Sequence, residues 1–396
     1  MKVAALFAGI GGLEQGLHKA GHETVMTCEV WEPAIAVLSA RFSDVPNHPD
    51  VAELAALPDE AGLLTAGFPC QDLSQAGMTA GIDGKRSGLV EHVFRLLDRR
   101  RVPLVVLENV SFMLQLDKGA AMDRLVRRFE ERGYRWAYRT VNSLAFLPQR
   151  RERVFFVATC GDIDPESVLF ADEVDVPVLS TELTTHAHGF YWTEGTRGLG
   201  WAVDAIPTLK NGSTVGIPSP PAILMPDGRV IKPDIRDAER LQGFQEDWTA
   251  SAPDRLRWSL VGNAVTVPVA EWLGRRLAEP GIYDPTRDRC WSMRKGSFPK
   301  AARFDGTKRH VVEIGGFPDF KARQPLHEFL RYEGALRSVR ATAGFLARAE
   351  ASSLRFVPGF LDAVRAHLDF VRRADQKTDR VIKNGKARVP VLAAAD

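Results

Sequence analysis

Residues 1–160 alternate between short apolar runs and longer segments in which apolar residues recur every three to four positions. The short runs predict buried strands, and the longer segments predict amphipathic helices. Continuous apolar strands that alternate with helices are typical of an α/β fold with a mainly parallel sheet. We expect strands at 2–9, 24–30, 62–68, 102–109, 134–142 and 153–160, and helices at 13–21, 33–42, 89–100 and 120–133.

The pattern changes after this region. Residues 162–235 are rich in glycine, proline and threonine, with short apolar runs between turn signals, which predicts a small β-rich module. A helical pattern returns within 236–284. Beyond Pro285 two further amphipathic segments predict a helical extension over 285–396, whose last 20 or so residues we expect to be partly disordered.

Composition limits the classes of protein. The four cysteines lie far apart without a CxxC pair, which argues against a disulfide framework or a zinc site and fits a reducing cytoplasm. No apolar run approaches the roughly 20 residues that span a bilayer. The net charge of +2 is uneven, because residues 285–396 hold roughly 23 basic against 12 acidic residues. Such an excess indicates either a polyanionic partner or a solvated helical surface.

A glycine-rich turn, FAGIGG at 7–12, joins the first predicted strand to the first helix. Glycines let the backbone approach a ligand, and a helix N-terminus favours an anionic group. Glu14 occupies the third glycine position of GxGxxG, so a dinucleotide is not favoured, and a ligand with a carboxylate and a ribose fits better. The alternative is that the glycines only form a tight turn.

Acidic residues follow the next predicted strands. Glu29 ends the second strand about 20 residues past Gly9, where an acid accepts ribose hydroxyls in such folds. Asp50, with Val51, could receive an adenine amino group at the end of a short third element.

A second group of residues suggests chemistry. In GFPCQDLS (67–74), Cys70 follows a predicted strand, and Glu108 ends the next long strand. The segment QRRERVF (149–155) places Gln149, Arg151 and Arg153 at alternate positions, which a strand would put on one face. A thiolate, a carboxylic acid and guanidinium groups together suit attack on a ring that protonation activates. Alternatively, the cysteine fills a core and the charged groups are solvated.

Together these segments resemble the DNA cytosine-5 methyltransferases of the bacterial type, which depend on S-adenosylmethionine. LFAGIGGLEQGL is similar to the first family motif, GFPCQDLS to the Pro-Cys motif, ENV to the Glu motif and QRRERVF to the QxRxR motif. RDAERLQGF (236–244) and VGNAVTVPVAEWL (261–273) are similar to the last two motifs. The resemblance covers about 1–160 and 235–280, with all six motifs in the family's order.

The resemblance implies roles for individual residues. Cys70 would attack C6 of cytosine, Glu108 would engage N3, and Arg153 with Arg151 would hold the flipped base and its phosphate. The cofactor-binding residues that it implies are Phe7, Gly9, Gly11, Gly12, Glu29, Val30, Asp50, Val51, Pro69, Asn263 and Val265. The DNA-binding residues that it implies are Gln71, Ser74, Gln149 and Arg240. We expect no metal.

The resemblance also implies an organisation. It gives a Rossmann-like methyltransferase sheet with helices on both faces in a core of 1–161, completed by 236–284. Residues 162–235 would form a target-recognition module. We expect the basic extension over 285–396 to clamp the duplex. The alternatives are a docking surface for a partner protein, with Phe329, Leu336, Phe345 and Leu346, and a structural cap.

The expected function is methylation of C5 of cytosine in a specific double-stranded DNA sequence. It would serve restriction–modification or phage defence, beside a cognate restriction or defence partner. We expect a monomer in the bacterial cytoplasm, associated with the nucleoid and not with a membrane. The alternatives are a tRNA cytosine-5 methyltransferase and a non-catalytic DNA-binding regulator.

Overall fold

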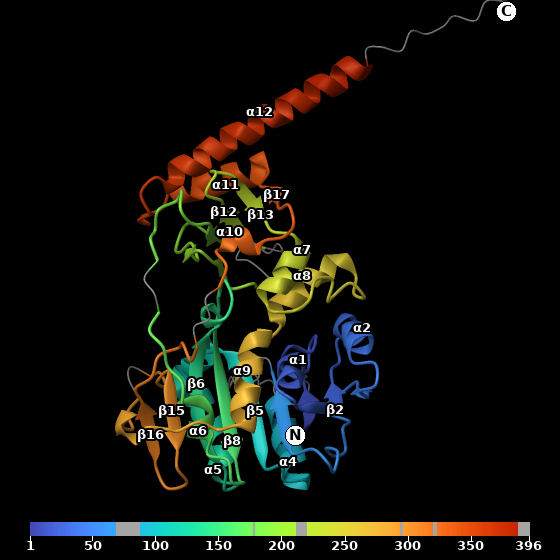
Figure 1. Cartoon of the computed structure of the whole chain (residues 1–396), viewed down its shortest axis with the longest axis vertical. Coiled ribbons are helices and arrows are strands. Elements are labelled where there is room, and N and C mark those ends of the chain that lie inside the picture. The colour runs from blue at the N-terminus through green and yellow to red at the C-terminus, as the bar shows by residue number, and fades with distance from the viewer. Residues whose placement is uncertain (69–87, 177–178, 211–219, 294–295, 320–322, 387–396) are drawn as a thin grey trace, which may run out of the picture. The chain divides into compact units, whose positions relative to one another are not determined.

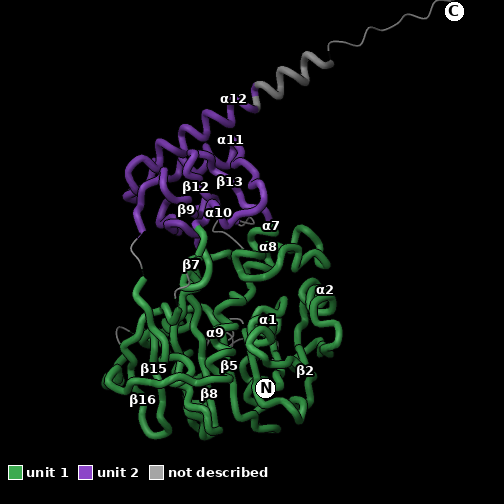
Figure 2. Tube along the Cα trace, viewed as in Figure 1, with its two compact units in different colours: residues 1–178, 208–211, 235–324 green, residues 179–207, 212–234, 325–396 purple. Residues whose placement is uncertain are grey.

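The computed structural model of the chain divides into two compact units (Figure 2). Unit 1 comprises Met1–Val178, Thr208–Asn211 and Ile235–Gln324, and unit 2 comprises Leu179–Pro207, Gly212–Asp234 and Pro325–Asp396. The structure describes residues 1–68, 88–176, 179–210, 220–293, 296–319 and 323–386. In the described part of the chain, every helix is too short or too polar to cross a membrane.

A ten-stranded sheet forms the centre of unit 1, in the order β14-β16-β15-β6-β8-β5-β4-β1-β2-β3 (Figure 1). Its strands are β1 (Lys2–Leu6), β2 (Glu23–Cys28), β3 (Asn47–His48), β4 (Leu63–Ala66), β5 (Leu104–Val110), β6 (Arg135–Asn142), β8 (Glu152–Thr159), β14 (Asp288–Cys290), β15 (Ala301–Phe304) and β16 (Arg309–Val312). The short β7 (Gln149–Arg150) precedes β8.

The sheet is mixed, so the expectation of a mainly parallel sheet is wrong. The strands β3, β2, β1, β4 and β5 run parallel, but β8, β6, β15, β16 and β14 each run antiparallel to the neighbour before them. The link from β6 to β8 explains the change. It is too short for the crossover of a dozen or more residues that a parallel pair requires, so these strands pair as a hairpin.

Helices cover both faces of the sheet, as expected. On one face, α4 (Leu89–Arg99) and α5 (Ala120–Glu130) pack on alternate strand residues such as Val105 and Leu107. On the other, α1 (Gly12–Lys19), α6 (Pro165–Leu169) and α9 (Val267–Ala278) pack on residues such as Leu104 and Val106. The alternation follows from the period of two along a strand. The other α-helices among the described residues of unit 1 are α2 (Glu32–Arg41), α7 (Ile235–Leu241) and α8 (Asp254–Asn263).

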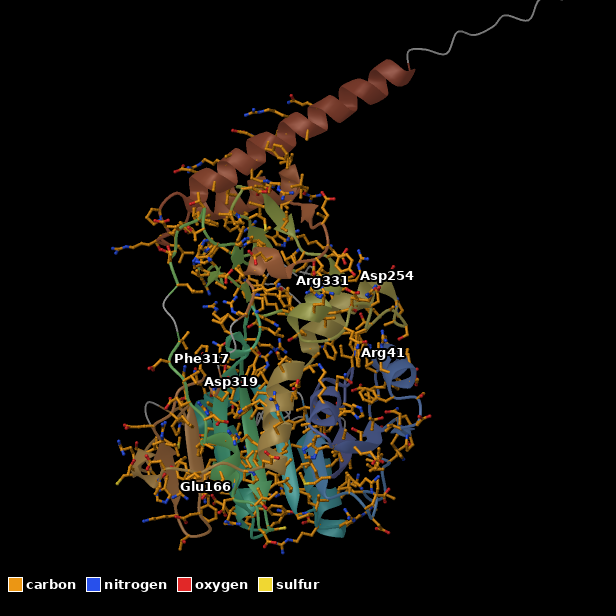
Figure 3. The ribbon with its side chains drawn as sticks, in the orientation of Figure 1. Arg41, Glu166, Asp254, Phe317, Asp319 and Arg331 are labelled. Atoms are coloured by element: carbon orange, nitrogen blue, oxygen red, sulfur yellow. The ribbon has the colours of Figure 1, made fainter. Side chains whose placement is uncertain are left out.

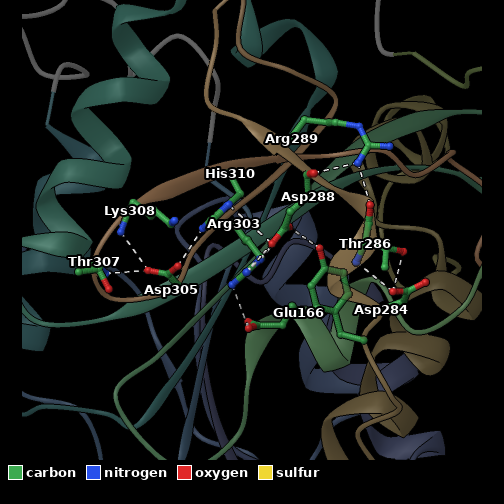
Figure 4. A network of polar contacts seen from close by, with 11 residues as sticks. Glu166, Asp284, Thr286, Asp288, Arg289, Arg303, Asp305, Thr307, Lys308 and His310 are labelled. Carbon is green, nitrogen blue, oxygen red and sulfur yellow. Dashed lines mark hydrogen bonds and ion pairs between the residues drawn. The ribbon is translucent and has the colours of Figure 1, made fainter.

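The expectation of a helical extension over 285–396 is wrong for its first part. The strands β14, β15 and β16 lie there and belong to the large sheet. The strand β15 pairs with β6, and ion pairs join β15 to β14 and to α6 (Figure 4). Arg303 on β15 lies 2.6 Å from the carboxylate of Asp288 on β14 and 3.3 Å from that of Glu166 on α6. Arg309 on β16 binds Asp123 and Glu130 of α5 at 2.6 and 2.7 Å. Much of the basic charge in this segment is therefore neutralised within unit 1.

Unit 2 holds a five-stranded sheet in the order β10-β9-β12-β13-β17, in which all four pairs are antiparallel. Its elements are β9 (His188–Phe190), β10 (Ala202–Val203), β11 (Ile206–Pro207), β12 (Ala222–Leu224), β13 (Val230–Lys232), α10 (Leu326–Phe329), β17 (Ala335–Leu336), α11 (Val339–Glu350) and α12 (Phe360–Lys386). Residues 162–235 therefore supply four of the five strands of this sheet, and the C-terminal segment supplies the fifth, β17.

The apolar residues of the C-terminal helices form the core of unit 2. Phe345 and Leu346 of α11 are buried with Phe360 of α12, and the Phe345 ring lies 5.1 Å from that of Phe190 on β9. Because Phe345 and Leu346 are buried, they are not available for the docking surface that was one alternative for this region. Leu336 remains exposed.

Candidate active site

A cavity of about 420 Å³ lies in unit 1 at the edge where the parallel strands end. The carboxyl ends of β1, β2, β4 and β5 meet there, and the start of the antiparallel β8 reaches the same edge. Ligands bind at this edge in open α/β sheets, and the volume falls in the range of small-molecule sites. The residues from the sequence analysis that line it are Phe7, Gly9, Gly12, Glu29, Val30, Glu108, Arg151, Arg153, Asn263 and Val265.

Glu29 is held at the glycine loop by backbone donors. Its Oε2 accepts a hydrogen bond from the amide of Gly9 at 2.8 Å. Its Oε1 accepts from the amides of Val30 and Trp31 at 3.0 and 2.8 Å. Gly9 has a φ of 58°, which a glycine adopts without strain, whereas Phe7 adopts a φ of 55° with a full side chain. The strained Phe7 backbone marks this loop as a candidate functional element.

Two glycines of the loop serve different contacts. A Cβ on Gly12 would lie 2.6 Å from the carbonyl oxygen of Val265, so the first turn of α1 can approach the α8–α9 link only without a side chain. A Cβ on Gly11 would lie 2.3 Å from the ring of Phe42, and Gly11 does not line the cavity. Gly11 therefore packs against Phe42, the residue that follows α2, and the cofactor contact expected of it stays untested.

The loop is also held from outside the cavity. The indole of Trp248 donates to the carbonyl oxygen of Ile10 at 2.9 Å. Arg41, which ends α2 (Figure 3), donates to the carbonyl of Trp248 at 3.0 Å and lies 4.9 Å from the centre of its ring. These contacts fix the glycine loop between α2 and the segment that follows α7.

Glu108 and Arg153 form a largely buried ion pair that lines the same cavity. Arg153 is paired with Val110 across β5 and β8, which makes Glu108 its diagonal neighbour on one face. The Nε of Arg153 lies 3.2 Å from Oε1 of Glu108. Burial raises the pKa of the Glu108 carboxyl above its ordinary value, and the positive charges of Arg153 and Arg151 partly offset this rise.

Asn109 joins the ends of β4 and β5. Its side-chain amide donates to the carbonyl oxygen of Phe68 at 2.9 Å, while its own oxygen accepts from the amide of Val110 at 2.8 Å. Phe68 lies two positions before Cys70 in the chain. The expected residues Pro69, Cys70, Gln71 and Ser74 lie outside the described residues.

Comparison with known proteins identifies the family. The model of the C-5 cytosine-specific DNA methylases matches residues 1–188. The type II methyltransferase M2.BsuMI of Bacillus subtilis is 44% identical over 366 residues, which cover 88% of this chain and 93% of that protein. The chain belongs to the C-5 cytosine-specific DNA methylase family. It is thus a DNA (cytosine-5-)-methyltransferase.

More distant matches of this methylase are consistent with the same family and fold. The type II methyltransferase M.HpaII of Haemophilus parainfluenzae is 28% identical over 322 residues, covering 70% of this chain and 90% of that protein. The fold is similar to that of the S. pombe Dnmt2 methyltransferase, with a TM-score of 0.55, 17% identity, and coverage of 70% of this chain and 98% of that chain.

Gln149 and Arg151 of the methylase are interior residues. Gln149 is fully buried, and its side chain bonds the backbone of Leu241 and Leu209 and the amide of Gln242. This placement is inconsistent with the expected contact to DNA. Arg151 lines the cavity, but its guanidinium donates to the carbonyls of Leu209, Gly262 and Ala264 at 3.0, 3.2 and 2.7 Å.

Three further expected residues lie apart from the methylase cavity. Asp50 accepts a hydrogen bond from the amide of Ala52 in a turn after β3, and Val51 is buried in the core beside α4, so neither lines it. Arg240 on α7 lies 2.7 Å from the buried carboxylate of Asp237, and the DNA contact expected of it stays untested.

Some residues next to motif positions line the cavity without having been expected there from the sequence. Trp31 lines the cavity in the turn after Glu29, and Asn109 follows Glu108. Glu14 also lines it, although in the sequence it stands out only as a departure from GxGxxG. An aromatic residue just after a strand-end acid, and an amide directly after the acid near the end of β5, are signals that could have indicated the first two.

Proposed function

We propose that this methylase transfers a methyl group from S-adenosylmethionine to C5 of cytosine in a specific double-stranded DNA sequence, through covalent addition of Cys70 to C6. One observation carries the proposal: the glycine loop with Glu29 and the Glu108–Arg153 pair line a single cavity of about 420 Å³. A cofactor bound at the first group and a base bound at the second would be neighbours.

The residues present fit S-adenosylmethionine. Gly9 and Gly12 line the cavity without side chains of their own, so a ligand can approach the backbone there. The carboxylate of Glu29, held by three amides, would accept the ribose hydroxyls. Val30 and Trp31 would flank the adenine, and Asn263 would close the cavity from α8. When bound, the cofactor supplies an electrophilic methyl group on a sulfonium.

The residues at the other end suit activation of the base. The Cys70 thiolate would form a bond to C6, while Glu108 would give its proton to N3, so that the ring accepts the electron pair. The raised pKa of Glu108 favours the protonated carboxyl that this step needs. Arg153 would hold the cytosine against Glu108. C5 becomes nucleophilic, and loss of its proton after methylation would expel Cys70.

The chemistry requires the cytosine to leave the helix, because neither C5 nor C6 can be reached in a stacked duplex. We assign target recognition to unit 2, which combines Leu179–Pro207 and Gly212–Asp234 with the C-terminal helices. The relatives are named type II methyltransferases, and we infer a restriction–modification role for this chain.

The Cys70→Ser variant tests the proposal. We expect no methyl transfer to DNA from labelled S-adenosylmethionine and unchanged DNA binding, since the side chains are nearly equal in size. Turnover near the wild-type rate would overturn the assignment of Cys70. Offering tRNA beside DNA separates the two substrates, and bisulfite sequencing of DNA from cells that express the protein would reveal the methylated site.

A further inference from the structure

Glu14 is a buried carboxyl at the wall of the cavity. It lies in the first turn of α1, its side chain is 1% exposed, and it lines the cavity with the glycine loop. Oε1 accepts a hydrogen bond from Oγ1 of Thr65 on β4 at 3.3 Å. Oε2 is buried and has no hydrogen-bond partner among the described residues.

A carboxyl in this position is unfavourable without a ligand. A buried acceptor without a partner is destabilising, and more so if it is charged. Burial raises the pKa of Glu14 to about 7, and the nearby negative charge of Glu29 adds to the rise. An apolar residue of similar size would avoid this cost, so the position indicates a need for an acceptor at the cavity.

The wall around Glu14 presents both signs of charge. The first turn of α1 carries amide groups without partners inside the helix, which favour an anion, and Glu14 projects from the same turn. The methionine part of S-adenosylmethionine carries a carboxylate and an ammonium on one carbon. A zwitterion of this kind matches a helix terminus with a carboxylate beside it.

We propose that Glu14 binds the α-ammonium group of the methionine part of S-adenosylmethionine. The inference rests on the proposed function, because it assigns a residue to that same cofactor. The ionised carboxylate would accept a charge-assisted hydrogen bond through Oε2, while Oε1 keeps its bond from Thr65. Glu14 is then a binding residue for the amino-acid end of the cofactor, as Glu29 is for its ribose.

Three ligands separate the possible contacts of Glu14. S-adenosylmethionine carries both an ammonium and a sulfonium, S-adenosylhomocysteine carries only the ammonium, and 5′-methylthioadenosine carries neither. Their dissociation constants are measured by calorimetry on the whole protein, for the wild type and for Glu14→Gln, which removes the charge but keeps the shape. Glu23→Gln is the matched control, because Glu23 is an exposed carboxylate that begins β2 at the opposite edge of the sheet.

We expect Glu14→Gln to weaken S-adenosylmethionine and S-adenosylhomocysteine by about 10- to 100-fold, as for a lost hydrogen bond to a charged group, and to leave 5′-methylthioadenosine unchanged. Glu14→Asp, which keeps the charge but shortens its reach, should give a smaller loss. Weakening of S-adenosylmethionine alone would place Glu14 at the sulfonium and overturn the proposal. Equal effects on all three ligands, or none, would also overturn it. If the wild type bound none of the ligands, the proposed function itself would fail.

Discussion

The Nε of Arg153 lies 3.2 Å from Oε1 of Glu108, and both side chains are largely withdrawn from solvent. The pair sits at the edge of the sheet because β5 and β8 are antiparallel, which brings the end of one strand beside the start of the other. Burial raises the pKa of Glu108, and the guanidinium opposes this rise. Arg153 therefore sets the pH range over which Glu108 can carry the proton that the proposed mechanism requires.

Replacing Arg153 by alanine should shift the pH profile of methylation. Without the guanidinium, the pKa of Glu108 rises further, so the carboxyl stays protonated to higher pH. We expect a slower reaction overall and an alkaline limb displaced to higher pH in single-turnover rates. Arg153→Lys keeps a positive charge and should displace the limb less. A displacement toward lower pH in Arg153→Ala would contradict this account of the pair.

Glu108→Gln should separate chemistry from cofactor binding. The amide has the shape of the carboxyl but cannot transfer a proton to N3, and loss of a general acid typically lowers a rate by about 10²- to 10⁴-fold. We expect this loss in methyl transfer at saturating S-adenosylmethionine, with the dissociation constant of the cofactor unchanged. A variant that methylates at the wild-type rate would show that protonation by Glu108 is not needed.

Gln149→Ala should act on stability. Its side chain satisfies the amide of Leu209 and the carbonyl of Leu241 inside unit 1, and both would be left buried without it. We expect a loss of about 1–3 kcal/mol in the free energy of unfolding, measured with urea. Gln115→Ala, at an exposed position, should change it by less than about 0.5 kcal/mol. If Gln149→Ala lowered DNA affinity at full stability, Gln149 would contact DNA after all.

The sequence predicted the parts of the site that depend on local pattern. Glycine turns and acids at the ends of parallel strands must meet at one edge, so the loop at 7–12, Glu29 and Glu108 could be placed together. The environment of Gln149 and Arg151 could not be predicted, because it depends on Leu209, a residue about 60 positions away. The surroundings of Asp50 could not be predicted either, because β3 is only two residues long and the chain turns directly after it, and its expected contact with the cofactor stays untested.

The C-terminal region shows a second limit of prediction from the sequence. The strands β14, β15 and β16 are three or four residues long, too short for the period of two to be recognised in the sequence. They form because β6 offers an edge and because Asp288, Glu166 and Glu130 pair with their arginines. The charge count predicted a basic surface here, but it cannot distinguish a free arginine from a paired one.

The buried carboxyl of Glu14 should make stability depend on pH without any cofactor. Its pKa in the folded protein is about 7, above the ordinary 4.5, so ionisation at higher pH opposes folding. Relative to Glu14→Gln, the wild type should lose about 3 kcal/mol of unfolding free energy as pH rises from about 4.5 through about 7. Urea denaturation of both proteins at pH 5 and pH 8 measures the change. A constant difference between them would contradict a raised pKa for Glu14.

We expect a DNA clamp formed by the C-terminal extension to use residues of unit 2. The arginines of β15 and β16 are held in ion pairs in unit 1, whereas Arg355, just before α12, and Arg373, on α12, are exposed. If both contact phosphates, each releases about 0.9 counterion, so replacing both by glutamine should lower the slope of log affinity against log salt by about 2. Arg99→Gln is the control, because Arg99 ends α4 near the start of β5, at the sheet edge opposite the cavity. A slope that stays the same in the double variant would remove these arginines from the DNA interface and favour a structural role for α12, whose Phe360 already packs in the core of unit 2.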